Sequence, residues 1–122
     1  ADIVRQLEEK YNVFTHMTPS YGSFKGCITV KGIITITSTN EVTPCPYIDF
    51  SLGNLRKTSL KEVLDRGMRN KWLGPHRPDC LIGEDPSFIK LHQEKTANRT
   101  HLPVPWGEGF SDDNVSNLLN LG

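Results

Sequence analysis

Residues 27–45 read CITVKGIITITSTNEVTPC and hold the clearest β-strand pattern in the chain. Isoleucine and threonine alternate over residues 33–37, and an alternation of β-branched residues favours a β-strand. Turn-forming residues occupy 38–40, and a second candidate strand follows at 41–44, where a proline ends it. This stretch therefore predicts a small β-hairpin with strands near 33–37 and 41–44.

Helix patterns flank the hairpin on both sides. Residues 2–12 repeat apolar side chains at helical spacing. The run SLKE at 59–62 is a capping box for a helix over 60–70, because its serine and glutamate can each satisfy a free backbone N–H group. The Asp-Pro pair at 85–86 starts another helix, and residues 111–113 can cap a last short one. We therefore predict an α+β fold, with a small β-hairpin and three or four helices around a cysteine-rich loop site.

Two segments are expected to lack regular structure. Five glycines and prolines in residues 73–86 predict a stiff, irregular loop around Cys80. This loop has few apolar side chains, so packing alone is not expected to offset an ordering cost of about 1–2 kcal/mol per residue. Residues 97–122 are expected to form an extended segment and the last short helix. The core is expected to include Ile34, Ile36, Leu60, Val63 and Leu64.

Length and charge exclude several functions. The chain has 122 residues, which fits one domain over 1–122. Its 14 basic and 14 acidic residues cancel, which argues against a general nucleic-acid surface and against a polybasic membrane surface. No segment approaches the roughly 20 apolar residues that span a bilayer, and no signal-peptide pattern opens the chain. Residues 56–77 alone carry seven basic and two acidic side chains, which fits either a solvated helix face or a docking surface for an anionic partner.

The three cysteines are the most informative residues. An odd number of cysteines cannot pair completely within one chain, which disfavours a secreted disulfide scaffold. Cys27 follows a glycine, Cys45 lies between two prolines, and Cys80 lies in the irregular loop. Three thiolates from separate loops can hold zinc with a histidine, or an iron–sulfur cluster with one iron left open or bound by another ligand. The residues alone leave metal binding and unconnected core thiols equally open, because there is no C-x-x-C motif.

The order of these motifs resembles a known family. The sequence runs from Gly26-Cys27 through the hairpin to VTPCPY at 42–47, LGNL at 52–55, SLKEVL at 59–64 and then Cys80. This order is similar to the C-terminal auxiliary-cluster region of radical SAM enzymes, the SPASM domain or the shorter twitch domain, over residues 24–94. Asn40 stands where the family has a glycine. The substitution is physically reasonable, because asparagine tolerates the left-handed turn conformation well.

The resemblance implies an iron–sulfur function. Cys27, Cys45 and Cys80 would bind one twitch-like 4Fe-4S cluster, since Gly83 stands where the next family thiolate would fall. The C-x3-C-x2-C motif that binds the catalytic cluster and S-adenosylmethionine is absent from this sequence. The chain is therefore expected not to catalyse alone. It would be the carboxyl-terminal piece of a radical SAM oxidoreductase or modifying enzyme, or would act beside a separate catalytic subunit, positioning a peptide or small-molecule substrate or relaying an electron.

Several alternatives remain open at this level. His92 is the first candidate for a fourth ligand and His76 the second, while an open iron needs neither. A Cys3His zinc module with a structural or protein-interaction role is the main rival, and a metal-free domain that binds a partner is the third hypothesis. Thiolate ligands must stay reduced, so we expect a cytoplasmic protein without a native disulfide.

Overall fold

The computed structural model describes residues 2–11, 20–21 and 24–110. The helices are α1 (Asp2–Lys10), α2 (Leu60–Arg69), α3 (Leu81–Glu84), α4 (Pro86–Thr96) and α5 (Trp106–Gly109). The strands are β1 (Ser20–Tyr21), β2 (Phe24–Lys25), β3 (Thr35–Ile36), β4 (Glu41–Thr43) and β5 (Gly53–Asn54). The predicted α+β class is confirmed, while the short helix expected after residue 111 lies outside the described residues.

The predicted hairpin forms, and it belongs to a three-stranded sheet. β3 and β4 pair antiparallel, with Ile36 opposite Val42. Asn40 lies in the turn between them with φ +68°, the left-handed conformation expected of it. The third strand, β5, was missed because its Gly53 and Asn54 are poor strand formers, yet they pair with β4. β1 and β2 form a separate antiparallel pair.

Helix α2 begins at the predicted capping box and packs on the sheet. The hydroxyl of Ser59 accepts the backbone N–H of Glu62 at 3.2 Å. Val63 is fully buried, and a Cβ added to Gly53 of β5 would lie 3.1 Å from it. Gly67, one turn later, lets the helix approach the chain near the first cysteine. A Cβ on Gly67 would lie 2.8 Å from Val30.

The core differs from the expected one at two positions. Ile36 is 50% exposed and Leu60 is 44% exposed, so neither belongs to it. Ile36 projects from the outer face of its strand, and Leu60 lies in the first turn of α2 away from the inward pair Val63 and Gly67. Both misassignments arose because periodicity alone does not fix which face is covered. In the described part of the chain, the fully buried apolar side chains are Val42, Ile48, Phe50, Leu52, Val63, Leu73, Leu81, Phe88, Val104 and Phe110.

The segment 73–86 packs against the core at two positions. Its two leucines, Leu73 and Leu81, are fully buried, and the second one begins α3. Asn70 anchors the start of the segment, because its side-chain oxygen accepts the N–H groups of Trp72 at 2.8 Å and Leu73 at 3.2 Å. Although the segment has few apolar residues, both of its leucines are fully buried, so packing contributes to its order.

The segment expected to be extended after residue 97 contributes to the core through α5. Val104 pairs with Phe50 in an isolated β-bridge and is fully buried. Phe50 also contacts Phe88 of α4 and Phe110, edge to face, with ring centroids 6.0 Å and 5.0 Å apart. This aromatic cluster fastens α4 and α5 to the sheet.

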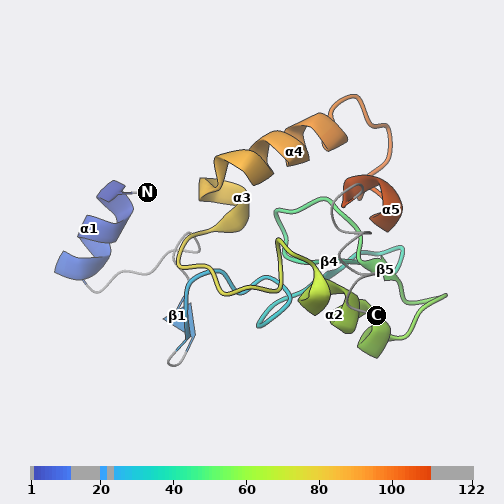
Figure 1. The fold of residues 1–122 in the computed structure, drawn as a ribbon, viewed down its shortest axis with the longest axis horizontal. Coiled ribbons are helices and arrows are strands. Elements are labelled where there is room, and N and C mark those ends of the chain that lie inside the picture. Colours follow the sequence, from blue (N-terminus) through green and yellow to red (C-terminus); the bar gives the residue numbers. More distant parts are fainter. Residues whose placement is uncertain (1, 12–19, 22–23, 111–122) are drawn as a thin grey trace.

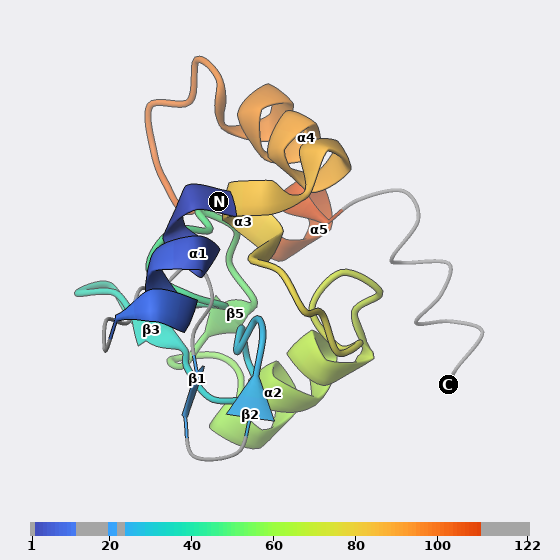
Figure 2. The ribbon, with the colours of Figure 1, turned by 90° about the vertical axis from the view of Figure 1, so that its left-hand side faces the viewer.

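Figure 1 and Figure 2 show α3 and α4 on one side of the three-stranded sheet and α2 on the other. Asp85 caps α4 as predicted, with its carboxylate accepting the N–H of Phe88 at 3.0 Å. The segment that carries Cys80 connects the two sides. No helix in the described part of the chain is both long and apolar enough to cross a membrane.

Candidate metal centre

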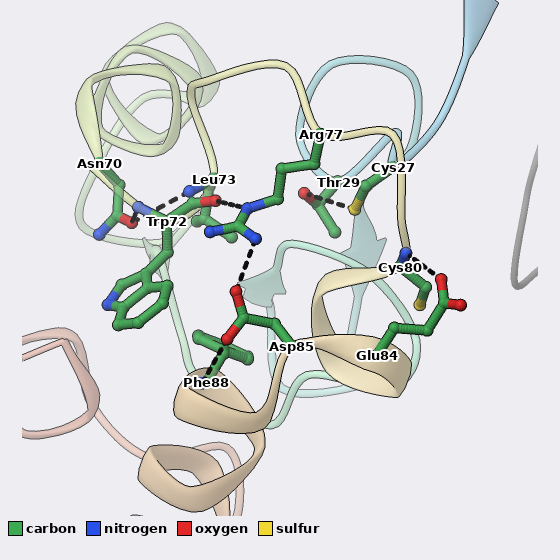
Figure 3. A network of polar contacts seen from close by, with 10 residues as sticks. All are labelled: Cys27, Thr29, Asn70, Trp72, Leu73, Arg77, Cys80, Glu84, Asp85 and Phe88. Carbon is green, nitrogen blue, oxygen red and sulfur yellow. Dashed lines mark hydrogen bonds and ion pairs between the residues drawn. The ribbon is translucent and has the colours of Figure 1, made fainter. Parts of the chain in front are cut away.

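Cys27 is fixed by backbone contacts with the segment that carries Cys80. Its N–H donates to the carbonyl oxygen of Arg77 at 3.0 Å. Gly26 makes this approach feasible, since it has φ +109° and a Cβ there would collide with the same carbonyl oxygen. The Cys27 sulfur lies 3.4 Å from the hydroxyl of Thr29, within hydrogen-bonding distance (Figure 3). The first and third cysteine loops are therefore joined through their backbones.

Cys45 is held next to the same turn. Val30 donates its N–H to the carbonyl of Pro44 at 3.2 Å and to that of Ile33 at 2.9 Å. The hydroxyl of Thr43, at the end of β4, donates to the Cys45 carbonyl at 3.2 Å. The Cys27 turn is thus the centre of the arrangement, because it bonds to both other cysteine loops.

Cys80 is the N-cap residue of α3. Its N–H donates to the carboxylate of Glu84 at 2.7 Å, and its carbonyl accepts the Glu84 N–H at 2.8 Å (Figure 3). This reciprocal pair fixes the backbone of Cys80. Its side chain is half-buried, whereas Cys27 and Cys45 are 4% and 7% exposed.

The three cysteines are free thiols. Burial raises the pKa of Cys45 to about 11, the N–H groups of Tyr47 and Ile48 oppose this rise, and the charges of Cys27 and Cys80 add to it. Burial also raises the pKa of Cys80, and the charge of Cys27 contributes again. Backbone hydrogen bonds therefore join the loops that carry the three predicted cysteines, and their grouping as ligands of one centre stays a prediction.

The thiols do not form a compact site for one metal ion. Within residues 2–11, 20–21 and 24–110, no three His, Cys, Asp or Glu side chains are grouped so that they could hold one. Zinc bonds to sulfur at about 2.3 Å, so its thiolates must lie within roughly 4 Å of one another. An iron–sulfur cluster contains several metal and sulfide atoms and accepts thiolates from farther apart.

His92 lies elsewhere in the fold. Its Nε2 accepts the backbone N–H of Asp49 at 3.0 Å, and its ring lies 5.1 Å from that of Phe50. Burial lowers the pKa of His92, and the Asp49 carboxylate, 3.9 Å away, partly opposes this. The Nε2 of His92 is therefore already engaged in a hydrogen bond that holds α4 against the chain at Asp49. His76 lies on the same segment as Cys80 and is exposed.

Two cations lie near the cysteines, and only Arg77 belongs to the basic stretch noted in the sequence. The Lys31 ammonium donates to the carbonyls of Leu73 and Thr29. Burial lowers the pKa of Lys31, while the nearby Cys27 opposes that effect. Arg77 lies over the ring of Trp72 and pairs with the Asp85 carboxylate at 2.7 Å. Lys31 lies before the alternating run at 33–37, and no sequence pattern distinguished it from an ordinary surface lysine.

Comparison with known families agrees with this geometry. Residues 27–82 match the SPASM iron–sulfur cluster-binding domain. The SPASM match starts at the first cysteine and ends two residues after the third, so it contains all three, and it covers a little less than half of the chain. The resemblance found in the sequence is thereby confirmed over this segment. No curated protein and no solved structure matches the chain significantly.

Proposed function

We propose that this chain is the auxiliary-cluster domain of a radical SAM enzyme and binds one 4Fe-4S cluster through Cys27, Cys45 and Cys80. The observation that carries the proposal is the SPASM match, which contains all three free cysteines, and the backbone bonds that join their loops support it. The SPASM match is to an iron–sulfur cluster-binding domain, which favours a cluster over the zinc alternative.

The protein's own groups fit such a cluster. Thiolates carry negative charge, and the backbone N–H groups of Tyr47 and Ile48 stabilise that charge at Cys45. The bonds from Cys27 to Arg77 and from Val30 to Pro44 fix the loop positions before any cluster binds, which lowers the ordering cost of binding. A bound cluster would supply an electron-transfer centre or an open iron for a substrate atom. Because His92 Nε2 already accepts the backbone N–H of Asp49, the fourth iron would be open or bound by His76.

The rest of the reaction belongs to a partner in this proposal. A radical SAM catalytic domain or subunit would bind S-adenosylmethionine, because this sequence has no C-x3-C-x2-C motif. The auxiliary domain would position a peptide or small-molecule substrate, or relay an electron, in a reducing cytoplasm. Burial of two thiols then protects the cluster from water.

Anaerobic reconstitution with iron and sulfide tests this proposal. The wild-type protein should become coloured and retain iron and acid-labile sulfide after desalting. Cys27→Ser, Cys45→Ser and Cys80→Ser should each lose the cluster, whereas His92→Gln should keep it. Tight, colourless, stoichiometric zinc binding without a stable cluster would instead support the zinc module.

A further inference from the structure

We propose that the Lys31 ammonium is the positive counter-charge of the cluster and raises its reduction potential. This inference rests on the proposed cluster function. Lys31 lies four residues after Cys27 on the turn that also holds Thr29, and the Thr29 hydroxyl contacts the Cys27 sulfur at 3.4 Å.

The environment of Lys31 is unusual for a lysine. Its side chain is half-buried, and the ammonium donates to two backbone carbonyls, those of Leu73 and Thr29, the latter at 3.4 Å. A lysine has three N–H donors, so one donor remains beyond these two contacts. No carboxylate in the described part of the chain pairs with Lys31. Partly burying a charge without an opposite charge is unfavourable, and a negatively charged cluster nearby would offset this cost.

Lys31 differs from the neighbouring Arg77 in its charge partners. Arg77 also lies next to the cysteine loops, but its guanidinium is neutralised by Asp85 at 2.7 Å. Among these two cations, Lys31 is the one without a carboxylate partner among the described residues. Its attraction to the Cys27 sulfur and its repulsion by Arg77 are the electrostatic interactions that reach it.

The turn that carries Lys31 is held in an unfavourable backbone conformation. Val30 has φ +64°, which is costly for a β-branched residue. The Val30 N–H donates to the carbonyl oxygens of Ile33 and Pro44, and these hydrogen bonds hold Val30 in this conformation. Such a rigid turn keeps the Lys31 backbone in place next to Cys27.

The expected effect on the cluster is electrostatic. A reductant such as dithionite adds one electron to the cluster, so the reduced form carries one more negative charge than the oxidised form. A nearby ammonium stabilises the reduced form more and raises the reduction potential. Because Lys31 is half-buried, the effect should be screened less by salt than that of an exposed charge.

Potentiometric titration of the reconstituted protein tests the inference. Lys31→Gln keeps an N–H donor for the Leu73 carbonyl but removes the charge, so its potential should fall below that of the wild type at low and at high salt. Lys31→Met should show the same fall, whereas Lys31→Arg should retain most of the wild-type potential. Lys61→Gln is the control, since Lys61 is 85% exposed on α2 and pairs with Asp65, and it should leave the potential unchanged.

The outcomes separate the two proposals. Equal potentials in the wild type and both neutral variants would overturn the role of Lys31 while leaving cluster binding intact. Failure of the wild type itself to assemble a cluster would overturn the proposed function, whatever the variants do.

Discussion

A side chain at Gly26 would collide with the carbonyl oxygen of Arg77, the same atom that accepts the N–H of the next residue, Cys27. The segments around Gly26 and Arg77, some fifty residues apart in the sequence, therefore contact each other at this glycine. This contact keeps the first and third cysteine loops together without any metal, and it explains why a glycine precedes the first cysteine.

Gly26→Ala should destabilise the protein. The residue has φ +109°, which side chains rarely adopt, and the new methyl group would displace the Arg77 carbonyl. A strained backbone position of this kind costs about 1–3 kcal/mol. Urea titration of the metal-free protein measures the free energy of unfolding. Gly107→Ala is the control, because a Cβ there meets nothing within 4 Å, and it should change little.

Asn40 should tolerate glycine better than alanine. Its φ of +68° is left-handed. The hydrogen bond from the N–H of Asn40 to the carbonyl of Thr37, at 3.0 Å, holds the backbone in this conformation. Asn40→Ala should lower the free energy of unfolding by about 1 kcal/mol, whereas Asn40→Gly should be nearly neutral. Equal losses in the two variants would mean that the side chain, not the backbone conformation, is what the turn needs.

Two apolar residues of α2 should differ sharply in their contribution to stability. Val63 is fully buried, so Val63→Ala should cost about 2 kcal/mol. Leu60 is 44% exposed, so Leu60→Ala removes more atoms but should cost only about 0.5 kcal/mol. Thermal or urea unfolding of both variants decides the matter. A larger loss at Leu60 would indicate that α2 presents its other face to the core.

Asp85 should stabilise the fold in a pH-dependent way. Burial alone would raise the pKa of Asp85, but the Phe88 N–H and the Arg77 guanidinium outweigh it and lower that pKa in the folded state. A lowered folded pKa contributes stability that is present above the unfolded value of about 3.9 and is lost as pH falls through the folded value. Asp85→Asn can still cap α4, yet should lose about 1 kcal/mol at neutral pH.

The loss in Asp85→Asn should shrink toward pH 2–3, where the wild-type carboxylate becomes protonated. Asp65→Asn is the matched control, because the exposed Lys61–Asp65 pair lies in high-dielectric solvent. A loss in Asp85→Asn that is independent of pH would contradict the proposed charge interaction.

Local sequence patterns predicted most of the elements of the fold. The β-branched alternation, the Ser59 cap, the Asp85 cap and the left-handed Asn40 each depend on residues within a few positions, and the structure has all four. β5 depends instead on β4, because Gly53 and Asn54 have no strand preference of their own. The burial of Leu73 and Leu81 likewise depends on distant segments, which no local pattern reports.

The candidate site also has features that the local sequence predicts and features that depend on distant contacts. Glycines and prolines beside the cysteines, together with the order of motifs, predict Cys27, Cys45 and Cys80 as ligands, and the SPASM match contains all three. Spacing cannot say which way a helix faces, so it could not foresee that His92 bonds to Asp49. Lys31 approaches the cysteines through a turn whose key residue, Val30, is in a conformation that valine rarely adopts.

Native mass spectrometry of the anaerobically reconstituted protein tests the central claim most directly, because it weighs whatever the cysteines hold. The account predicts that the wild-type chain gains the mass of one 4Fe-4S cluster, that each of Cys27→Ser, Cys45→Ser and Cys80→Ser loses it, and that His92→Gln keeps it. A wild-type chain that carries one zinc ion instead, or single cysteine variants that all keep the full cluster mass, would contradict the account.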